Sequence, residues 1–364
     1  MVTLDQLQLP RVGLAQPPRS KSRARRPYTS LEICAGAGGS ALGIEQAGFE
    51  HVALIEIEAA ACATLRLNRP EWNVLETDLR QFKGWPYIGV DFLSGGVPCP
   101  PFSKAGLQQG VDDERDLFPE ALRLVEVCKP RAVMLENVPG LMENRFADYR
   151  AQINARLAVL GYQTDWRIFQ AADFGVPQLR PRVLCVALQA DVAPFFAWPM
   201  KADTAPVTVG AALREMMASA GWEGADTWAE GANKVGPTLV GGSKKHGGPD
   251  LGPTRARGEW AKLGVNGLGI ANEPPPPGFI GQPKLTVPMA AVIQGFPTDW
   301  TFSGKKTSAY RQVGNAFPPP VARAVATAIE RAMRAADMRK PAPTMEQADG
   351  ASARSEKEAA RLLH

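Results

Sequence analysis

Short apolar runs alternate with segments of helical spacing along most of this chain. The apolar runs predict buried strands that end near residue 34, over 52–58, from residue 90, over 130–137 and around 178–187. The helical spacing predicts helices after residue 39 and over 118–128, 149–160 and 321–335. This alternation predicts an α/β fold built on a doubly wound, mostly parallel sheet.

The regular alternation stops near residue 190. From there to about residue 283 the chain is rich in Gly, Pro, Trp and Lys without a clear period. We therefore expect a larger domain at residues 28–190, a second, smaller, loop-rich domain at 191–304, and a return to the larger domain at 305–335. Residues 1–27 and 336–364 are expected to be solvated tails, although the basic run at 19–26 is also suited to contacts with phosphate.

Composition adds weak constraints to this division. The chain has 364 residues, enough for two domains, with 35 Gly and 32 Pro, which suits a protein with many loops. Its formal net charge of +4 favours a polyanionic partner only slightly, because many enzymes have a similar balance.

The cysteines, histidines and apolar runs exclude several classes of protein. The five cysteines are scattered and form no Cys-x-x-Cys pair, which indicates a reducing compartment. The three histidines do not cluster, so we expect no zinc or other metal site. No apolar run is long enough to span a membrane, and the N-terminus lacks a signal-like apolar core. We therefore expect a cytoplasmic protein.

One cysteine lies where an α/β sheet places its chemistry. Cys99 follows a predicted strand and two glycines, and it lies between Pro98 and Pro100. Prolines stiffen the backbone, and the crevice beyond parallel strand ends is where such sheets bind ligands. The alternatives are a reactive thiol and an inert buried cysteine, which is the commoner fate. The polar segment 104–117 that follows has the composition of an active-site lid.

Other strand ends carry Gly-rich and charged groups. The turn at residues 35–39 suits close approach of a ligand, but it is neither Gly-x-Gly-x-x-Gly nor a phosphate-binding Gly-Lys-Ser loop. Glu56 ends the second predicted strand, where a carboxylate can accept hydrogen bonds from ribose hydroxyls or remain simply solvated. Gln178, Arg180 and Arg182 alternate along another strand, so we expect them to share a face and converge on one site.

In this order the segments resemble those of the DNA (cytosine-5) methyltransferases. The run from Gly95 to Ser103 resembles the nucleophile loop of that family, although Pro100 replaces the usual Gln. The remaining likenesses are the Gly-rich turn at 34–39, Glu136-Asn137-Val138, the Gln-x-Arg-x-Arg pattern, Thr238-Leu239, and residues 284–297 and 310–320. In 284–297, Met289-Ala290 replaces an Arg-Glu pair, which puts a salt bridge at those positions in doubt.

The resemblance implies methyl transfer from S-adenosylmethionine to C5 of a flipped cytosine, through a covalent adduct with Cys99. The implied catalytic residues are Cys99, Glu136, Arg180 and Arg182. The implied cofactor-binding residues are Cys34, Ala35, Gly36, Gly38, Gly39, Glu56, Ile57, Asp78, Leu79, Pro98 and Asn315. The residues that we expect to contact DNA are Ser103, Arg115, Gln178, Thr238, Lys244, Lys245, Arg255 and Arg257.

Two other functions remain open at this point. One is a tRNA cytosine-5 methyltransferase of the same fold, and the other is a DNA-binding homologue without catalysis. For the methyltransferase we expect a monomer acting on double-stranded DNA. It would be either the partner of a separate cognate restriction endonuclease or a solitary methylase. The recognition sequence is not visible in the residues.

Overall fold

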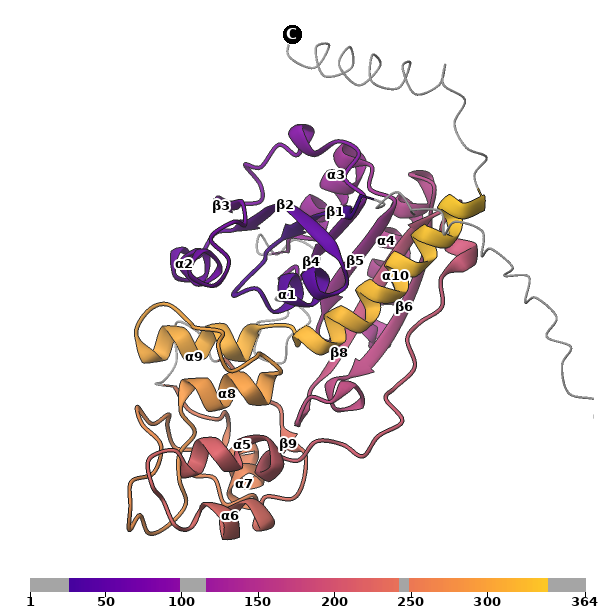
Figure 1. Cartoon of the computed structure of the whole chain (residues 1–364). Helices are drawn as coiled ribbons and strands as arrows, with labels where there is room; N and C mark the ends of the chain where they lie inside the picture. Colours follow the sequence, from indigo (N-terminus) through magenta and orange to yellow (C-terminus); the bar gives the residue numbers. More distant parts are fainter. Residues whose placement is uncertain (1–25, 99–115, 242–248, 340–364) are drawn as a thin grey trace, which may run out of the picture.

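The computed structural model describes residues 26–98, 116–241 and 249–339. Its centre is a seven-stranded sheet of order β3-β2-β1-β4-β5-β8-β6 (Figure 1). The strands are β1 (Tyr28–Ile33), β2 (Phe49–Glu56), β3 (Val74–Glu76), β4 (Phe92–Gly95), β5 (Ala132–Asn137), β6 (Tyr162–Gln170) and β8 (Pro181–Gln189). Strands β1 to β5 pair in parallel, whereas β8 runs antiparallel to β5 and β6. The predicted mostly parallel α/β sheet is therefore confirmed.

Helices cover both faces of this sheet. On one face lie α1 (Gly39–Gln46) and α10 (Pro319–Arg339), which crosses the strands in Figure 1, and on the other lie α3 (Phe118–Cys128) and α4 (Ala147–Val159). The strands supply both cores because successive side chains point to opposite faces. Phe92, for example, joins the core under α10, and its neighbour Leu93 joins the core under α3. Helix α2 (Ala59–Asn68) connects β2 to β3.

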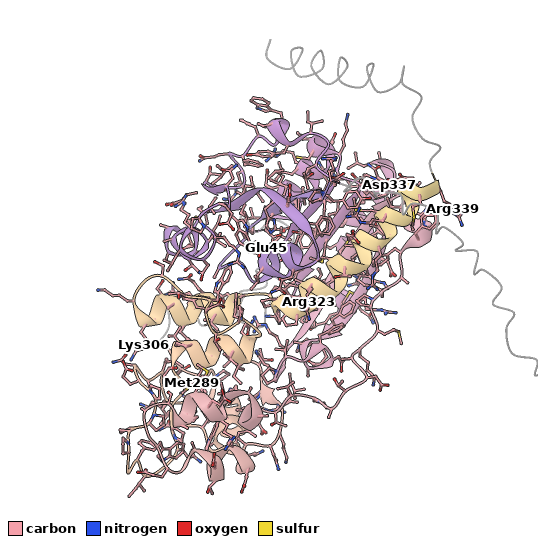
Figure 2. The ribbon with its side chains drawn as sticks, in the orientation of Figure 1. Glu45, Met289, Lys306, Arg323, Asp337 and Arg339 are labelled. Atoms are coloured by element: carbon pink, nitrogen blue, oxygen red, sulfur yellow. The ribbon has the colours of Figure 1, made fainter. Side chains whose placement is uncertain are left out.

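Helix α10 extends four residues beyond the predicted end at residue 335. Its last turn is held by Asp337, which accepts a hydrogen bond from the Tyr28 hydroxyl and lies 2.9 Å from Arg131 Nη2 (Figure 2). Arg339 stacks over the Phe195 ring. These tertiary contacts keep the last turn helical where the sequence suggested a solvated tail. No helix among the described residues is long and apolar enough to cross a membrane.

The region from residue 191 to 283 is more regular than its composition suggested. It contains α5 (Val209–Ala218), α6 (Ala225–Gly231), α7 (Thr254–Ala261) and the short strand β9 (Gly236–Pro237). Val209, Leu213 and Met217 are fully buried at helical spacing along α5, and the Thr208 hydroxyl caps its first turn. The helices are short and separated by Gly and Pro, which hid their period in the sequence.

Two further helices join this region to the sheet. Helix α8 (Val287–Gln294) packs against α5 and against α9 (Lys306–Asn315), and β9 pairs with β7 (Gln178–Leu179) (Figure 1). Met289 and Ala290 are fully buried in α8. Apolar packing therefore occupies the positions at which a salt bridge was in doubt.

Close packing of α1 on the start of α10 generates a prediction about stability. A Cβ at Gly43 would lie 2.4 Å from the Pro319 carbonyl oxygen and 2.6 Å from Ala322 Cβ. Gly43→Ala should therefore lower the free energy of unfolding by about 1–3 kcal/mol, because overpacking forces the two helices apart.

Gly258→Ala is the matched control, since a Cβ at Gly258 of α7 meets nothing within 4 Å. It should raise the free energy of unfolding by up to about 1 kcal/mol, as Ala usually does in an exposed helix. Urea denaturation of both variants measures the difference, and equal stabilisation by both would contradict the packing described here.

Candidate active site

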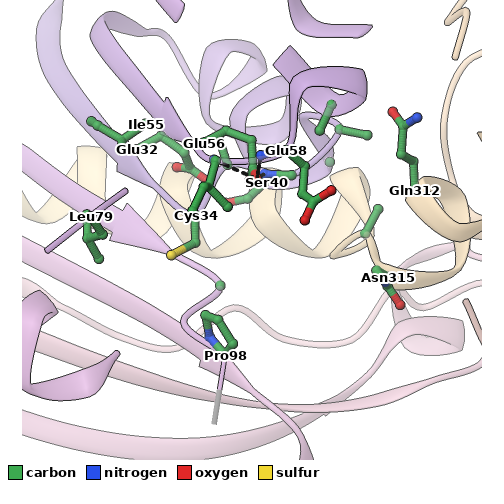
Figure 3. Close-up of a pocket in the computed structure, with 18 of the residues that line it drawn as sticks. Glu32, Cys34, Ser40, Ile55, Glu56, Glu58, Leu79, Pro98, Gln312 and Asn315 are labelled. Atoms are coloured by element: carbon green, nitrogen blue, oxygen red, sulfur yellow. Dashed lines mark hydrogen bonds between the residues drawn. The ribbon is translucent and has the colours of Figure 1, made fainter. Parts of the chain in front are cut away.

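A cavity of about 630 Å³ lies beyond the carboxyl ends of β1, β2, β4 and β5 (Figure 3). Strand β1 has β2 on one side and β4 on the other, and the connections leave these strands in opposite directions. Ligands bind to open α/β sheets at such a switch point. The volume is also within the range usual for small-molecule and cofactor sites. This cavity is the candidate active site.

The turn between β1 and α1 forms one wall of the cavity. Cys34 has a positive φ of 51°, which a residue with a Cβ rarely adopts outside sites of function. Burial raises the pKa of its thiol, so Cys34 stays protonated. A Cβ at Gly38 would lie 2.7 Å from Leu65 Cδ2, and one at Gly39 would lie 2.1 Å from the Phe317 carbonyl oxygen. These glycines thus let the turn pack on its neighbours, while Ala35, Gly36 and Gly39 line the cavity and Gly38 does not.

Glu56 joins this turn to the end of β2. Its Oε2 accepts a hydrogen bond of 2.7 Å from Gly36 N, and its Oε1 accepts bonds of 2.8 Å from Ile57 N and Glu58 N. A carboxylate has about four lone-pair sites, so one position on Oε2 is left for a ligand hydroxyl. The side chain lines the cavity, and the strand-end acid is therefore placed as the sequence predicted.

The next wall carries an apolar surface and a second acid. Ile57 is 58% exposed, and it lines the cavity together with Asp78 and Leu79. The pKa of Asp78 is lowered, chiefly by the backbone N–H of Arg80 and also by the Arg80 guanidinium, whose Nη1 lies 2.9 Å from Oδ2. Asp78 is thus ionised at neutral pH and can only accept hydrogen bonds.

Glu32 is a residue of the cavity that sequence reasoning missed. It is the last residue but one of β1, is almost fully buried, and accepts hydrogen bonds from the hydroxyls of Ser94 and Ser40. Burial raises its pKa to about 7, against the lowering effect of these two hydroxyls. The sequence contains no clear local signal for it, because β1 also contains the polar residues Thr29 and Ser30.

Glu136 and Arg182 form a partly buried ion pair at the far end of the cavity. Glu136 is the last residue but one of β5, and its Oε1 lies 2.7 Å from Arg182 Nε at the start of β8. Burial raises the pKa of Glu136, whereas the guanidinium groups of Arg182 and Arg180 oppose this shift. The Glu136 carboxyl lines the cavity and can therefore present either a proton or a charge to a ligand.

Asn137 links the Glu136 strand to the segment that leads to Cys99. Its Nδ2 donates to the Val97 carbonyl at 3.0 Å, and its Oδ1 accepts from Val138 N at 2.8 Å. Pro98 lines the cavity, and its carbonyl accepts a bond from Leu117 N, which lines it as well. Cys99, Ser103, Arg115 and most of the expected lid lie outside the described residues.

Of Gln178, Arg180 and Arg182, which were expected to converge on one site, Arg182 bonds to the cavity-lining Glu136, whereas Gln178 and Arg180 bond to other partners. Arg180 is 1% exposed, and it donates to the carbonyl oxygens of Leu239, Gly314 and Ala316 at 2.9, 2.7 and 3.1 Å. Gln178 is also fully buried, with bonds to Ile293, Gln294 and Leu239. The alternation fails because the chain leaves β7 at Leu179 and enters β8 only at Pro181. In this structure Gln178 is not accessible to DNA.

The carboxyl end of helix α9 closes the cavity beside the Gly-rich turn. Asn315, its last residue, is exposed and lines the cavity, as predicted for this position (Figure 3). Gln312 also faces the cavity, but its amide is already bonded to Thr64 Oγ1 at 2.6 Å and to the Ser303 carbonyl at 2.8 Å. Asn315 is therefore the better placed of the two amides to bind a ligand.

Some of the residues expected to contact DNA already bond to other protein groups, and another is exposed. The Thr238 hydroxyl donates to the Leu179 carbonyl, which joins β9 to β7. Arg257 lies 3.5 Å from Asp250 and donates to Thr254 Oγ1, whereas Arg255 on the same helix is exposed. Lys244 and Lys245 lie outside the described residues.

Comparison with known proteins agrees with this geometry. Residues 28–263 and 270–331 match the family of the C-5 cytosine-specific DNA methylases. The Type II methyltransferase M.NaeI of Lentzea aerocolonigenes is 55% identical over 309 residues, which cover 83% of this chain and 75% of that protein. The Type II methyltransferase M.NgoMIV of Neisseria gonorrhoeae is 55% identical over 310 residues, which cover 84% of this chain and 98% of that protein.

Solved structures share the fold. A protein described as a DNA modification methyltransferase encoded within an E. coli prophage superposes with a TM-score of 0.60 at 21% identity, covering 84% of this chain and 99% of its own. Spodoptera frugiperda DNMT2 superposes with a TM-score of 0.57 at 17% identity, covering 83% and 99%. The fold thus agrees with the sequence match, and the chain belongs to the C-5 cytosine-specific DNA methylase family as a DNA (cytosine-5) methyltransferase.

Proposed function

We propose that this enzyme transfers a methyl group from S-adenosylmethionine to C5 of a cytosine in a specific duplex sequence. The observation that carries the proposal is the cavity itself, which joins the strand-end acids Glu56 and Asp78 to the partly buried pair of Glu136 and Arg182. Because both relatives at 55% identity are Type II methyltransferases, we also propose that the enzyme is the modification partner of a cognate restriction endonuclease.

The donor groups of the cavity fit S-adenosylmethionine. The free lone pair of Glu56 suits a ribose hydroxyl, the exposed Ile57 side chain suits an adenine face, and the ionised Asp78 suits an amino group. Asn315 can then bind from the wall formed by the end of α9. When bound, this cofactor supplies an electrophilic methyl group on a sulfonium.

The remaining residues would activate the cytosine. Cytosine C5 is a weak nucleophile, and attack of the Cys99 thiolate on C6 makes it an enamine-like one. Glu136 would hold the edge of the ring and give a proton to N3 as electron density builds there, which its raised pKa favours. Once C5 carries the methyl group, loss of the C5 proton to a base expels the Cys99 thiolate, and return of the N3 proton to Glu136 restores neutral, aromatic 5-methylcytosine.

Arg182 and Arg180 would have different tasks in this reaction. The Arg182 guanidinium, 2.7 Å from Glu136, orients that carboxyl and offsets charge on it. Arg180 bonds only to backbone carbonyls, so we assign it a positioning role.

A stacked base cannot enter the cavity, so the target cytosine would have to flip out of the duplex, at a cost of about a few kcal/mol. We propose that residues from 191 to 304 select the sequence. Among its described basic residues, Arg255 is exposed and suited to contact DNA, while Arg257 holds the loop at Asp250. Phosphate contacts by this region would position the duplex, and contacts to base edges would specify it.

Expression in a host that lacks DNA methylation tests this function directly. Bisulfite sequencing of the host DNA should show one methylated sequence, and Cys99→Ala should abolish the signal without weakening binding of S-adenosylhomocysteine by calorimetry. A duplex of that sequence with 5-fluorocytosine at the target should trap a covalent adduct on Cys99, because fluorine blocks the last elimination. Methyl transfer to tRNA alone, or trapping on another cysteine, would refute the proposal.

The ion pair predicts a shift in the pH dependence of the rate. The Arg182 guanidinium lowers the pKa of Glu136, and the rate should fall as pH rises and Glu136 loses its proton. Arg182→Met removes this effect, so the pKa of Glu136 rises and the falling limb of kcat/KM should move to higher pH. Glu136→Gln should lower kcat by about 10²-fold or more, the usual contribution of a general acid. A limb that stays in place in Arg182→Met would argue against protonated Glu136 as the acid.

The two arginines of α7 should separate in their effect on DNA binding. Arg255→Ala should reduce the slope of log affinity against log salt by about one unit if Arg255 contacts a phosphate. If Arg255 instead reads a guanine, the loss should be about 1–3 kcal/mol at one base pair. Arg257→Ala should leave the slope unchanged, since its charge is directed at Asp250. Fluorescence anisotropy over a salt series measures the slope for the wild type and for each variant. If Arg255→Ala has the same slope and the same sequence preference as the wild type, Arg255 does not contact the DNA.

A further inference from the structure

Two glycine backbones meet between the proposed DNA-binding region and the cofactor cavity. Gly241 follows β9, and Gly314 lies in the last turn of α9. A Cβ at Gly314 would lie 2.4 Å from both Cα and N of Gly241. A Cβ at Gly241 would lie 2.2 Å from Asn315 Oδ1 and 2.8 Å from the Arg311 carbonyl oxygen. Only glycine at both positions allows this approach.

Asn315 lies between the cofactor cavity and the segment that follows β9. It lines the cofactor cavity, as Figure 3 shows, and its side-chain oxygen is the atom that a Cβ at Gly241 would strike first. The rotamer of Asn315 is therefore limited by how closely the segment after β9 approaches α9.

Buried polar side chains hold the two segments together. Arg180 donates to the Leu239 carbonyl on one side and to the Gly314 and Ala316 carbonyls on the other. Gln178 accepts from Leu239 N, and Gln294 donates to Ala316 O. Separating the segments would leave buried donors without acceptors, which is costly. We therefore expect residues 239–241 and the end of α9 to move as one unit.

We propose that Gly241 is a positioning residue that couples DNA binding to cofactor binding by setting the orientation of Asn315. The coupling rests on the proposed cofactor, S-adenosylmethionine, and on the proposed DNA contacts near Thr238 and Arg255. Bound DNA would stabilise residues 239–241 in the position seen here, packed on the end of α9. It would thereby also hold the Asn315 side chain in the orientation that faces the cofactor. Because linkage is reciprocal, the cofactor must tighten DNA binding by the same factor.

A double-mutant cycle without DNA tests the step through Asn315. The affinity for S-adenosylhomocysteine is measured by calorimetry for the wild type, Gly241→Ala, Asn315→Ala and the double variant. Each single change should weaken binding by about fivefold or more, and the double variant should be no weaker than the weaker single variant. Additive losses would mean that Gly241 acts independently of Asn315 and would overturn the proposal.

Gly231→Ala is the matched control, since a Cβ there meets nothing within 4 Å and the residue lies at the end of α6. Its affinity for S-adenosylhomocysteine should equal that of the wild type. If the wild type itself does not bind S-adenosylhomocysteine, the proposed cofactor is wrong. Binding with an additive cycle refutes only the role of Gly241.

The coupling is measured as the ratio of DNA affinities with and without saturating S-adenosylhomocysteine. The probe is a fluorescently labelled duplex with the sequence found by bisulfite sequencing, and its binding is measured by fluorescence anisotropy. The wild type and Gly231→Ala should show a ratio of about five or more, and Gly241→Ala should bring it close to one. If Gly241→Ala only lowered the stability of the protein, the affinities for both ligands would fall but the ratio of DNA affinities would stay unchanged. That result would contradict the proposal. If Gly241→Ala does not fold, Asn315→Ala must lower the ratio, and an unchanged ratio in that variant also overturns the proposal.

Discussion

The buried guanidinium of Arg180 is the constraint on which the candidate active site depends. A charge removed from water is unfavourable unless its donors are bonded, and here three backbone carbonyls accept from the two Nη groups of Arg180, while its buried Nε has no partner among the described residues. Two of them lie at the carboxyl end of α9, where the helix dipole adds negative potential. The same side chain therefore joins the segment after β9, the end of α9 and the link between β7 and β8. Arg182, two residues later, is thereby held against Glu136.

The opposite wall of the cavity is fixed by sterics and by one carboxylate. Gly39 and Gly43 of α1 approach the backbone around Phe317 and Pro319 too closely for a side chain. From within the cavity, Glu56 binds the backbone N–H groups of the turns after β1 and β2. Both turns are thus held in place before any ligand enters. Such preorganisation reduces the free-energy cost of ordering the site on binding.

Individual residues show how far sequence reasoning reached. Glu56 and Glu136 were predicted at the ends of strands, and Asp78 was implied by the family resemblance. All three line one cavity because the carboxyl ends of neighbouring parallel strands meet at one edge of the sheet. Glu32 was missed, since a strand interior gives no local sign that its acid faces a cavity. The helices α5 to α7 were missed because each is short and their flanks are rich in Gly and Pro.

The sequence by itself determined the alternating α/β order, the chemistry available at each strand end and the family to which the chain belongs. These follow from local patterns, namely apolar spacing and short motifs that need no knowledge of distant contacts. Only the tertiary structure decided which partners the polar side chains of residues 178–182 take. Arg180 bonds to residues 59 to 136 positions away, and the alternation of its strand is interrupted between β7 and β8. A contact over such a separation depends on how whole helices pack, and local spacing carries no record of that packing.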